Sequence, residues 1–362
     1  MGVSMLTRAI ETYQNIAKLE DTSDHLNLAW TQDERDLIEP SIALLLSSCL
    51  TQELSNLRDI YHYPVNDPWG EQRLRSILRH YFSLPDTDFS LSCGAGVNSL
   101  LASLATLPEA CNVAVYGDIY PDFIWWLTQA KSNICWLPDG QLDEMCHTAS
   151  RQHASMVYLE RPALLAGIFD DLASLRLFCG MLEQRGILLL IDESNANYHA
   201  PSFSSASLLN TFSNLIVLRG VSKAWGLGGL RVGFCMSSSN LEKNIRRVVP
   251  PMLNPPLTLS MVAALLGCGD TTRRLRSQIM LSKTHVLAML SAKGVTPASA
   301  ALPYFFIDEE LRERFDKAGI RTKNHLFYRS LNERSTLIRM SVPLAEDRMV
   351  EFSRRLGVDF EN

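Results

Sequence analysis

Two apolar runs separated by a helical segment are the feature of this sequence that most restricts its fold. The runs cover residues 156–159 and 186–191, and residues 172–184 between them have the spacing of a helix. Strands that are apolar at every position are typical of parallel sheets, because helices cover both faces of such sheets. The pattern therefore predicts β-α-β units, and with them an α/β fold built on a mostly parallel central sheet.

A third apolar run, residues 215–218, leads into a turn that carries a single lysine. Ser222 and Lys223 follow the run, then three glycines between positions 226 and 229, and then Arg231. A lysine amine can form a Schiff base with an aldehyde cofactor, while a hydroxyl and a guanidinium can hold its phosphate. The stretch favours a phosphate-bearing aldehyde cofactor over a strand end with an incidental lysine.

The segment from Ser222 to Gly233 resembles the cofactor-lysine motif of the class I/II aminotransferases, which are fold-type I pyridoxal-phosphate enzymes. Within them it is most similar to the histidinol-phosphate aminotransferase-like branch. The resemblance spans roughly residues 60–345. It implies a large domain with the parallel sheet, a small α+β domain, and pyridoxal 5'-phosphate held by Lys223 as an internal aldimine.

A glycine-containing turn enters an apolar helix within residues 91–104. Backbone N–H groups at the start of a helix lack partners inside the helix and can bind a phosphate. The residues Gly94, Ala95, Gly96 and Val97 lie where the family has its phosphate-binding turn, and the resemblance implies that role. Many helices begin this way, so the turn adds support to Lys223 and is weak alone.

Asp192 directly follows the apolar run 186–191. Open α/β sheets bind their ligands at the carboxyl ends of parallel strands. A buried aspartate there can keep a pyridine nitrogen protonated, which makes the cofactor an electron sink. Asp192 resembles the family's aspartate and precedes Lys223 by 31 residues. The simpler alternative is an aspartate that caps a loop.

Two tyrosines match aromatic positions of the family. Tyr120 follows a predicted strand at residues 113–116, and the resemblance implies that its ring stacks on the pyridine. An aromatic side chain in a loop more often serves packing alone.

Tyr63 lies in a segment similar to one whose tyrosine reaches the phosphate of the neighbouring subunit. The family's spacing points to Val65 instead, so Tyr63 or Tyr61 serves only if the loop is longer, and a surface turn is the alternative.

The sequence departs from the family at both partners of the cofactor's phenolic oxygen. The family's tyrosine is replaced by Asn195, and the asparagine of its Asn-Pro-Thr-Gly-like segment is replaced by Leu164, which cannot donate a hydrogen bond. Asn195 is the expected substitute, with Asn197 or Tyr198 as alternatives from a shifted loop. Because these donors tune the cofactor, reactions other than transamination stay open.

A proline-rich stretch, residues 250–256, is the clearest boundary signal in the chain. Beyond it, the predicted strand 337–341 resembles the family segment whose arginine binds the substrate α-carboxylate. That residue is Arg339, and a guanidinium binds a carboxylate with two hydrogen bonds; a surface salt bridge is the alternative. The expected division is an N-terminal segment (residues 1–50, an arm and part of the small domain), a large cofactor-binding domain (51–250) and a small C-terminal domain (251–362).

Composition excludes several other classes of protein. The 362 residues carry a net charge of −5, so no basic field favours nucleic acid or an anionic membrane. Eight cysteines without a Cys-x-x-Cys pair argue against a zinc site and favour a cytoplasmic location. No run approaches the roughly 20 apolar residues that span a bilayer. The resemblance adds a homodimer and an amino-acid substrate to these expectations.

The assembled motifs favour an aminotransferase that acts on an α-amino acid. The main alternative is another pyridoxal-phosphate reaction on the same fold: a decarboxylase, an elimination or cyclisation enzyme, or an amino-acid oxidase of specialised biosynthesis. A non-catalytic binding module is a minor alternative, because a scaffold has no need to retain Lys223, Asp192 and Arg231.

Overall fold

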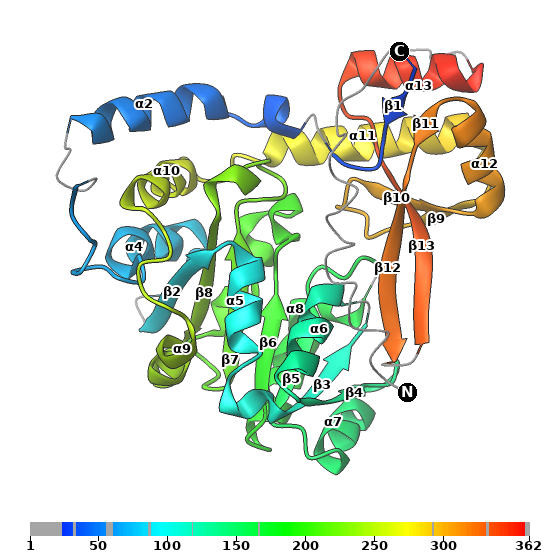
Figure 1. Cartoon of the computed structure of the whole chain (residues 1–362). Helices are drawn as coiled ribbons and strands as arrows, with labels where there is room; N and C mark the ends of the chain where they lie inside the picture. Colours follow the sequence, from blue (N-terminus) through cyan, green and yellow to red (C-terminus); the bar gives the residue numbers. More distant parts are fainter. Residues whose placement is uncertain are drawn as a thin grey trace.

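A seven-stranded sheet forms the larger part of the molecule (Figure 1). The computed structural model describes residues 24–31, 34–55, 61–85, 88–117, 119–165, 167–291, 293–330 and 333–358. In spatial order the strands are β2 (Phe89–Ala95), β8 (Val232–Ser238), β7 (Leu215–Gly220), β6 (Leu188–Asp192), β5 (Met156–Glu160), β3 (Asn112–Tyr116) and β4 (Asn133–Trp136). Strand β8 is antiparallel to both neighbours, and the other pairs are parallel. The predicted α/β fold with a mostly parallel sheet is confirmed.

Helices cover both faces of this sheet. The helices α5 (Val97–Leu104), α6 (Pro121–Gln129) and α9 (Glu242–Val248) pack on one face, and α7 (Leu142–Arg151) and α8 (Leu172–Glu183) pack on the other. Side chains of a strand alternate between faces. In β6, Leu190 therefore packs on the face covered by α5, α6 and α9, and Ile191 packs on the face covered by α7 and α8. The same alternation turns Asp192 and Glu193 toward opposite faces.

A smaller sheet lies in the C-terminal part of the chain. Its antiparallel strands are β12 (Lys323–Ser330), β13 (Glu333–Ser341), β10 (Tyr304–Ile307) and β9 (Val295–Pro297), in that order. The helices of this part are α11 (Arg273–Met289), α12 (Glu309–Lys317) and α13 (Glu346–Leu356). The long β12–β13 hairpin descends beside the large sheet, where β12 contacts α6 and β4 (Figure 1). The two sheets are therefore in contact through this hairpin.

Segments far apart in sequence meet at two places. Strand β1 (Leu26–Asn27) pairs in parallel with β11 (Ile320–Arg321), so the N-terminal segment joins the C-terminal part. Helix α10 (Pro256–Gly267) packs against α2 (Ile42–Leu54) and α4 (Glu71–Tyr81). Helices α10 and α11 are separate elements, and Cys268–Thr272 forms the turn between them.

Short 3-10 turns complete the described structure. They are η1 (Glu34–Leu37), η2 (Pro108–Cys111), η3 (Ile168–Asp170), η4 (Ala196–Tyr198), η5 (Pro201–Phe203), η6 (Ser205–Leu208), η7 (Gly228–Leu230) and η8 (Ser239–Leu241). Residues 1–23 of the expected N-terminal arm lie outside the described residues. Within the ranges given above, no helix has the length and apolar character needed to cross a membrane.

Candidate functional site

The candidate site lies at the carboxyl edge of the large sheet. Strands β5, β6 and β7 are parallel neighbours, so their last residues meet at one edge. Glu160 ends β5 and is the register partner of Asp192, which ends β6 and is only 6% exposed. The turn after β7 brings Lys223 to the same edge.

Hydrogen bonds fix the turn that carries Lys223. Gly226 adopts a φ of +61°, which favours glycine, and its N–H donates to the Lys223 carbonyl at 2.7 Å. The buried Trp225 indole donates to Thr271 Oγ1 at 2.9 Å, which anchors the turn to the α10–α11 connection. Lys223 is an exposed residue, so a ligand can reach it, while the protein around its side chain still desolvates the amine.

Charged groups from three parts of the chain act on Lys223. Desolvation by the surrounding protein lowers the pKa of Lys223, and the charge of Arg339 lowers it further. The carboxyl groups of Asp192, Glu160 and Glu34 oppose this shift. The net lowering favours the neutral amine, which is the form that attacks an aldehyde or accepts a proton.

The predicted phosphate-binding residues surround the junction of β2 and α5. Ala95 ends β2, and its carbonyl accepts a hydrogen bond of 2.8 Å from Nη2 of the exposed Arg231. Gly96 caps α5 with a φ of +82°, and a Cβ there would lie 2.8 Å from the same Nη2. A Cβ on Gly220 at the end of β7 would lie 3.0 Å from Val97 Cγ2. The β2–α5 turn contributes Gly94, Ala95, Gly96 and Val97, and the β7–β8 connection contributes Ser222 and Arg231.

Asp192 has donors on both of its carboxylate oxygens. Ser194 donates to Oδ1 from its backbone N at 2.8 Å and from its hydroxyl at 2.5 Å. The Tyr158 hydroxyl donates to Oδ2 at 3.4 Å. Burial raises the pKa of Asp192, against the effect of the Ser194 donors and of the Lys223 charge. A cation placed beside this buried carboxyl would stabilise its ionised form.

Tyr120 lies at the same edge and contacts a carboxyl group that the sequence reasoning missed. The half-buried Tyr120 donates its backbone N–H to Glu160 Oε1, and its hydroxyl donates to Asp122 at 2.7 Å. The only signal for Glu160 was a charged residue that closes the otherwise apolar run 156–159. No motif accompanied that signal.

Arg339 is buried in β13 and is only 8% exposed. Its Nη2 donates to the Ala29 carbonyl at 2.9 Å, and its guanidinium lies 4.5 Å from the Tyr304 ring centroid. Its Nε is buried without a hydrogen-bond partner among the described residues. Lys323, the register partner of Arg339 in β12, places its Nζ 3.7 Å from the Trp30 ring centroid. Trp30 and Lys323 were missed, since neither belongs to a recognisable pattern.

The expected substitutes for the phenolic-oxygen partners lie in and around η4. The Asn197 side chain donates to a backbone carbonyl of β7 and accepts from an arginine of that strand. The Tyr198 hydroxyl donates to Glu34 Oε1 at 3.0 Å. Both groups are engaged in these contacts. Of the three residues, Asn195, half-buried at the start of η4, is the one best placed to contact a ligand.

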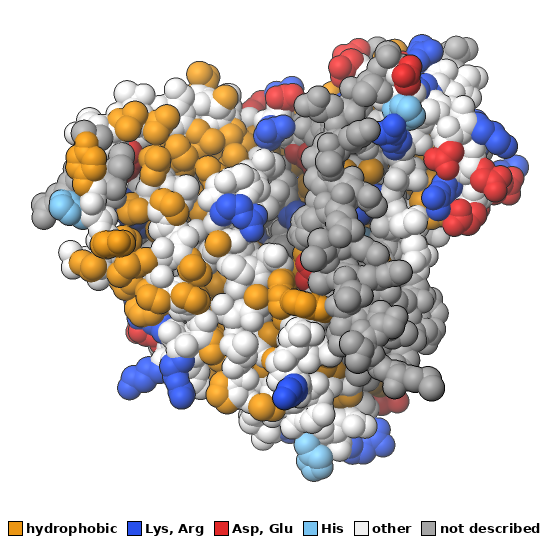
Figure 2. Space-filling model, viewed as in Figure 1, with side chains coloured by type: hydrophobic (Ala, Val, Ile, Leu, Met, Phe, Trp, Pro, Cys, Tyr) orange, Lys and Arg blue, Asp and Glu red, His pale blue; other side chains and the backbone are white. Residues whose placement is uncertain are grey.

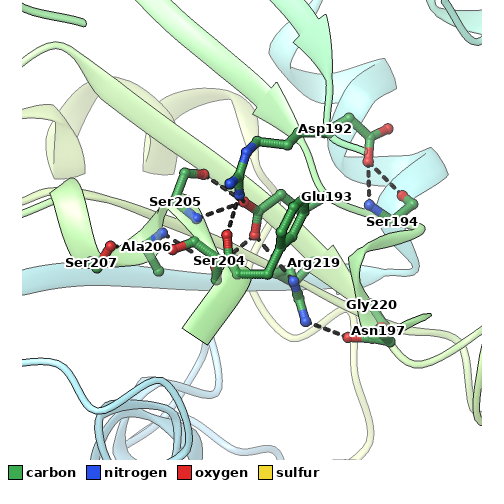
Figure 3. A network of polar contacts seen from close by, with 12 residues as sticks. Asp192, Glu193, Ser194, Asn197, Ser204, Ser205, Ala206, Ser207, Arg219 and Gly220 are labelled. Carbon is green, nitrogen blue, oxygen red and sulfur yellow. Dashed lines mark hydrogen bonds and ion pairs between the residues drawn. The ribbon is translucent and has the colours of Figure 1, made fainter. Parts of the chain in front are cut away.

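Behind the site, Glu193 is the centre of a buried ionic network (Figure 3). It forms ion pairs with Arg161 at 3.2 Å and Arg219 at 3.1 Å, and it accepts hydrogen bonds from Ser204 and Ser205. Burial alone would raise the pKa of Glu193, but the two arginines and these donors hold it below its usual range. The network joins the ends of β5, β6 and β7 on the face opposite Asp192.

Tyr63 is the predicted site residue that the structure does not bring to the others. Its side chain is 82% exposed in the segment before α4, so the ring is not packed into the cluster.

Comparisons with known proteins define the family. The sequence matches aminotransferase class I and II over residues 74–351, so the chain belongs to this family. An aromatic amino acid aminotransferase of Mycobacteroides abscessus is 25% identical over 304 residues, which cover 82% of this chain and 85% of that protein. Histidinol-phosphate aminotransferase 1 of Psychrobacter arcticus is 28% identical over 227 residues, which cover 63% and 54%.

A solved structure agrees in fold. Histidinol-phosphate aminotransferase of Sinorhizobium meliloti, in complex with pyridoxal-5'-phosphate, matches with a TM-score of 0.67 and 19% identity, covering 88% of this chain and 86% of that one. Family membership confirms the expectations of an enzyme of this class and of pyridoxal 5'-phosphate as cofactor. The residues present fit that group, because a glycine turn beside Arg231 suits a phosphate and the Lys223 amine is within reach of solvent.

Proposed function

We propose that this protein is a pyridoxal-phosphate-dependent aminotransferase that moves an amino group from an α-amino acid to a 2-oxo acid. The observation that carries the proposal is the convergence of Lys223, Asp192 and Arg339, which come from the two sheets. All three are coupled by charge, since both Asp192 and Arg339 shift the pKa of Lys223.

Each residue has a role set by its chemistry. The cofactor, when bound, supplies an electron sink for the bond that breaks at the substrate Cα. Lys223 binds the cofactor aldehyde and moves the proton at Cα, for which a neutral amine is required. Asp192 holds the proton of the pyridine nitrogen, and Tyr120 covers the ring. Arg339 binds the α-carboxylate of the substrate.

The remaining proposed residues position the cofactor. The β2–α5 turn from Gly94 to Val97, Ser222 and Arg231 hold the phosphate. Asn195 is proposed as the partner of the phenolic oxygen. Because leucine replaces the family's asparagine at position 164, Asn195 would be its main polar partner from the chain.

Product analysis tests the proposed reaction. The loaded protein is mixed with a panel of α-amino acids, first alone and then with a 2-oxo acid. An aminotransferase forms at most one equivalent of 2-oxo acid per site alone, and turns over when the acceptor is added. Turnover without an acceptor, with release of carbon dioxide or ammonia, would contradict the proposal.

That contrary outcome defines the second candidate function, a non-transaminating pyridoxal-phosphate enzyme. The observation in its favour is Leu164, buried at the position of the family's asparagine. Release of carbon dioxide identifies a decarboxylase, and consumption of oxygen identifies an oxidase.

We further propose that the protein is a homodimer. Exposed apolar side chains lie on α2 and the segment that follows it, and we call this the outer apolar surface: Leu44, Leu50, Leu54, Tyr61, Tyr63 and Val65. Hydrophobic side chains gather over α2 and α10 in Figure 2. An apolar patch of this kind usually marks an interface. A second copy seated here would let Tyr63 act at the phosphate site of its neighbour.

We propose that the chain divides at residues 50 and 250 into an N-terminal segment, a large domain and a small domain. The positions of the two sheets support the large and the small domain. All seven strands of the large sheet lie within residues 89–238, and the four-stranded sheet lies within residues 295–341. The β1–β11 pairing supports assigning part of the N-terminal segment to the small domain. Helix α10 follows the boundary but packs on α2 and α4, so it acts as a link between the two parts.

A further inference from the structure

Glu160 lies next to Asp192 on the face of the large sheet that carries the site. The two residues are register partners on the parallel strands β5 and β6. Tyr158 precedes Glu160 by two residues, so both side chains point to the same face. The resemblance to the family supplied Asp192 but assigned no role to Glu160 or Tyr158.

One hydroxyl group lies between the two carboxyl groups. The buried Tyr158 hydroxyl is 3.3 Å from Glu160 Oε1 and 3.4 Å from Asp192 Oδ2. A phenol donates only one proton, and it also accepts hydrogen bonds. If Tyr158 donates to one carboxylate, the second contact is a hydrogen bond only when the other carboxyl carries a proton and donates to the phenol oxygen. With both contacts formed as hydrogen bonds, the three residues therefore share one carboxyl proton in addition to the proton of the phenol.

The donors around the pair place that proton on Glu160. Asp192 Oδ1 accepts two hydrogen bonds from Ser194, which stabilise its ionised form. Burial and the charge of Asp192 raise the pKa of Glu160 to about 8, against the Tyr120 N–H donor and the charge of Lys223. Lys223 is the cation that acts on both carboxyl groups.

We propose that Glu160 is a positioning residue for the cofactor: through Tyr158 it shares a proton with Asp192 while the site is empty, and it gives up that proton when a protonated pyridine nitrogen binds at Asp192. This inference rests on the proposed pyridoxal-phosphate function. Glu160 acts through Asp192 and takes no part in the transfer of the amino group.

The arrangement has a pH signature with a defined sign. A protonated pyridine nitrogen beside Asp192 favours the ionised form of Glu160, so cofactor binding lowers the pKa of Glu160. By linkage, the affinity of wild-type protein for the cofactor rises with pH. The rise falls between the pKa of Glu160 in the cofactor-bound protein and its higher pKa in the free protein. Glu160→Gln keeps a neutral hydrogen-bonding side chain but removes this titration.

The test measures cofactor dissociation constants by equilibrium dialysis, without substrate, from about pH 6 to about pH 9, a range that brackets the raised pKa. The ligands are pyridoxal 5'-phosphate and its analogue with CH in place of the pyridine nitrogen. We expect wild-type protein to gain about tenfold in affinity for the natural cofactor relative to Glu160→Gln, which corresponds to one pKa unit. For the analogue we expect no gain.

Further variants separate this role from general damage to the fold. Glu160→Asp retains a titrating carboxyl and should keep the pH-dependent gain, while Tyr158→Phe should lose it. Matched controls are Glu183→Gln, which removes a carboxyl of α8 that accepts from Ser213, and Tyr116→Phe, which removes a hydroxyl bonded to Asp139. Both controls should match wild-type protein.

Two results would overturn the inference: an affinity ratio that is constant with pH, or an equal gain for the analogue. Either result leaves the proposed aminotransferase function intact, because that function is judged by its products. Failure of the wild-type protein to bind pyridoxal 5'-phosphate would overturn both.

Discussion

At the residue scale, Arg339 is the side chain on which recognition of a carboxylated substrate depends. It is buried, its Nε has no partner among the described residues, and its charge acts on Lys223. A hydrogen bond between charged groups contributes about 1.5–3 kcal/mol. Arg339→Ala should therefore raise KM for α-amino acids by about 10- to 100-fold, with a smaller change in kcat.

Steady-state kinetics check this expectation. An amine that lacks the carboxylate should show no such rise in KM. Arg312→Ala, which removes a surface arginine of α12 that pairs with Glu309, is the control. An unchanged KM in Arg339→Ala would remove this role from Arg339.

The buried Glu193 supports the site through stability. Glu193→Gln leaves Arg161 and Arg219 without their shared counter-charge, and breaking a buried pair costs about 3–5 kcal/mol. Because the pKa of Glu193 is lowered on folding, its contribution is present above its unfolded-state pKa and is lost as the pH falls through the folded-state value. Wild-type stability should fall steeply below about pH 4, and the variant should lose this part of the dependence.

Urea unfolding at several pH values measures the effect. The matched control is Glu351→Gln, since Glu351 also pairs with two arginines, Arg354 and Arg355, but at the surface. Its free energy of unfolding should change far less. Equal losses for the two variants would contradict the role given to the buried network.

Single residues were predictable from sequence where position and chemistry coincide. Lys223 and Asp192 follow apolar strands, and ligands bind at strand ends in this class of sheet. Glu160 also ends a strand, but its partner is set by the neighbouring strand, and sheet order is not visible in one sequence. Trp30 and Lys323 reach the site from distant segments, so no local pattern reveals them.

At the element scale, the β2–α5 junction determines the shape of the phosphate site. Gly96 combines a φ of +82° with a ψ of 165°, a conformation that is essentially restricted to glycine. A Cβ there would also meet Arg231 Nη2 at 2.8 Å. Gly96→Ala should add strain of about 1–3 kcal/mol and weaken binding of pyridoxal 5'-phosphate by about tenfold or more.

Fluorescence titration with the cofactor measures this loss. Gly267→Ala is the control, because a Cβ at that end of α10 would meet nothing within 4 Å and the φ is not positive. Full cofactor affinity in Gly96→Ala would show that the phosphate binds elsewhere.

Strands were predictable where every residue is apolar. The runs that became β3, β5, β6 and β7 all belong to this kind. Strand β4 is half-exposed at the edge of the sheet, and β12 begins with polar residues, so neither has a clear period. Edge strands are under weaker sequence constraint because only one side pairs.

At the scale of the whole molecule, the outer apolar surface predicts the assembly state. Leu44 is 74% exposed on α2, so its side chain contributes little to the stability of the single chain. Leu44→Glu should leave the fold intact and shift a dimer to monomers by burying an unpaired charge in the interface. Light scattering measures the mass, and Leu177→Glu, on the exposed side of α8, is the control. A wild-type protein that is monomeric at every concentration would contradict the proposed homodimer.

The proposed function depends on the bond between the cofactor and Lys223. Two other lysines also have low pKa values: burial lowers the pKa of Lys323 to about 7 and that of Lys283 to about 8. A low pKa therefore does not select the reactive amine, and the place of Lys223 beside Asp192 does. The most direct test is to reduce the cofactor-loaded protein with borohydride, digest it, and find the modified peptide by mass spectrometry. We expect the cofactor on Lys223 alone; a label on Lys323 or Lys283, or no label at all, would contradict the role proposed for Lys223.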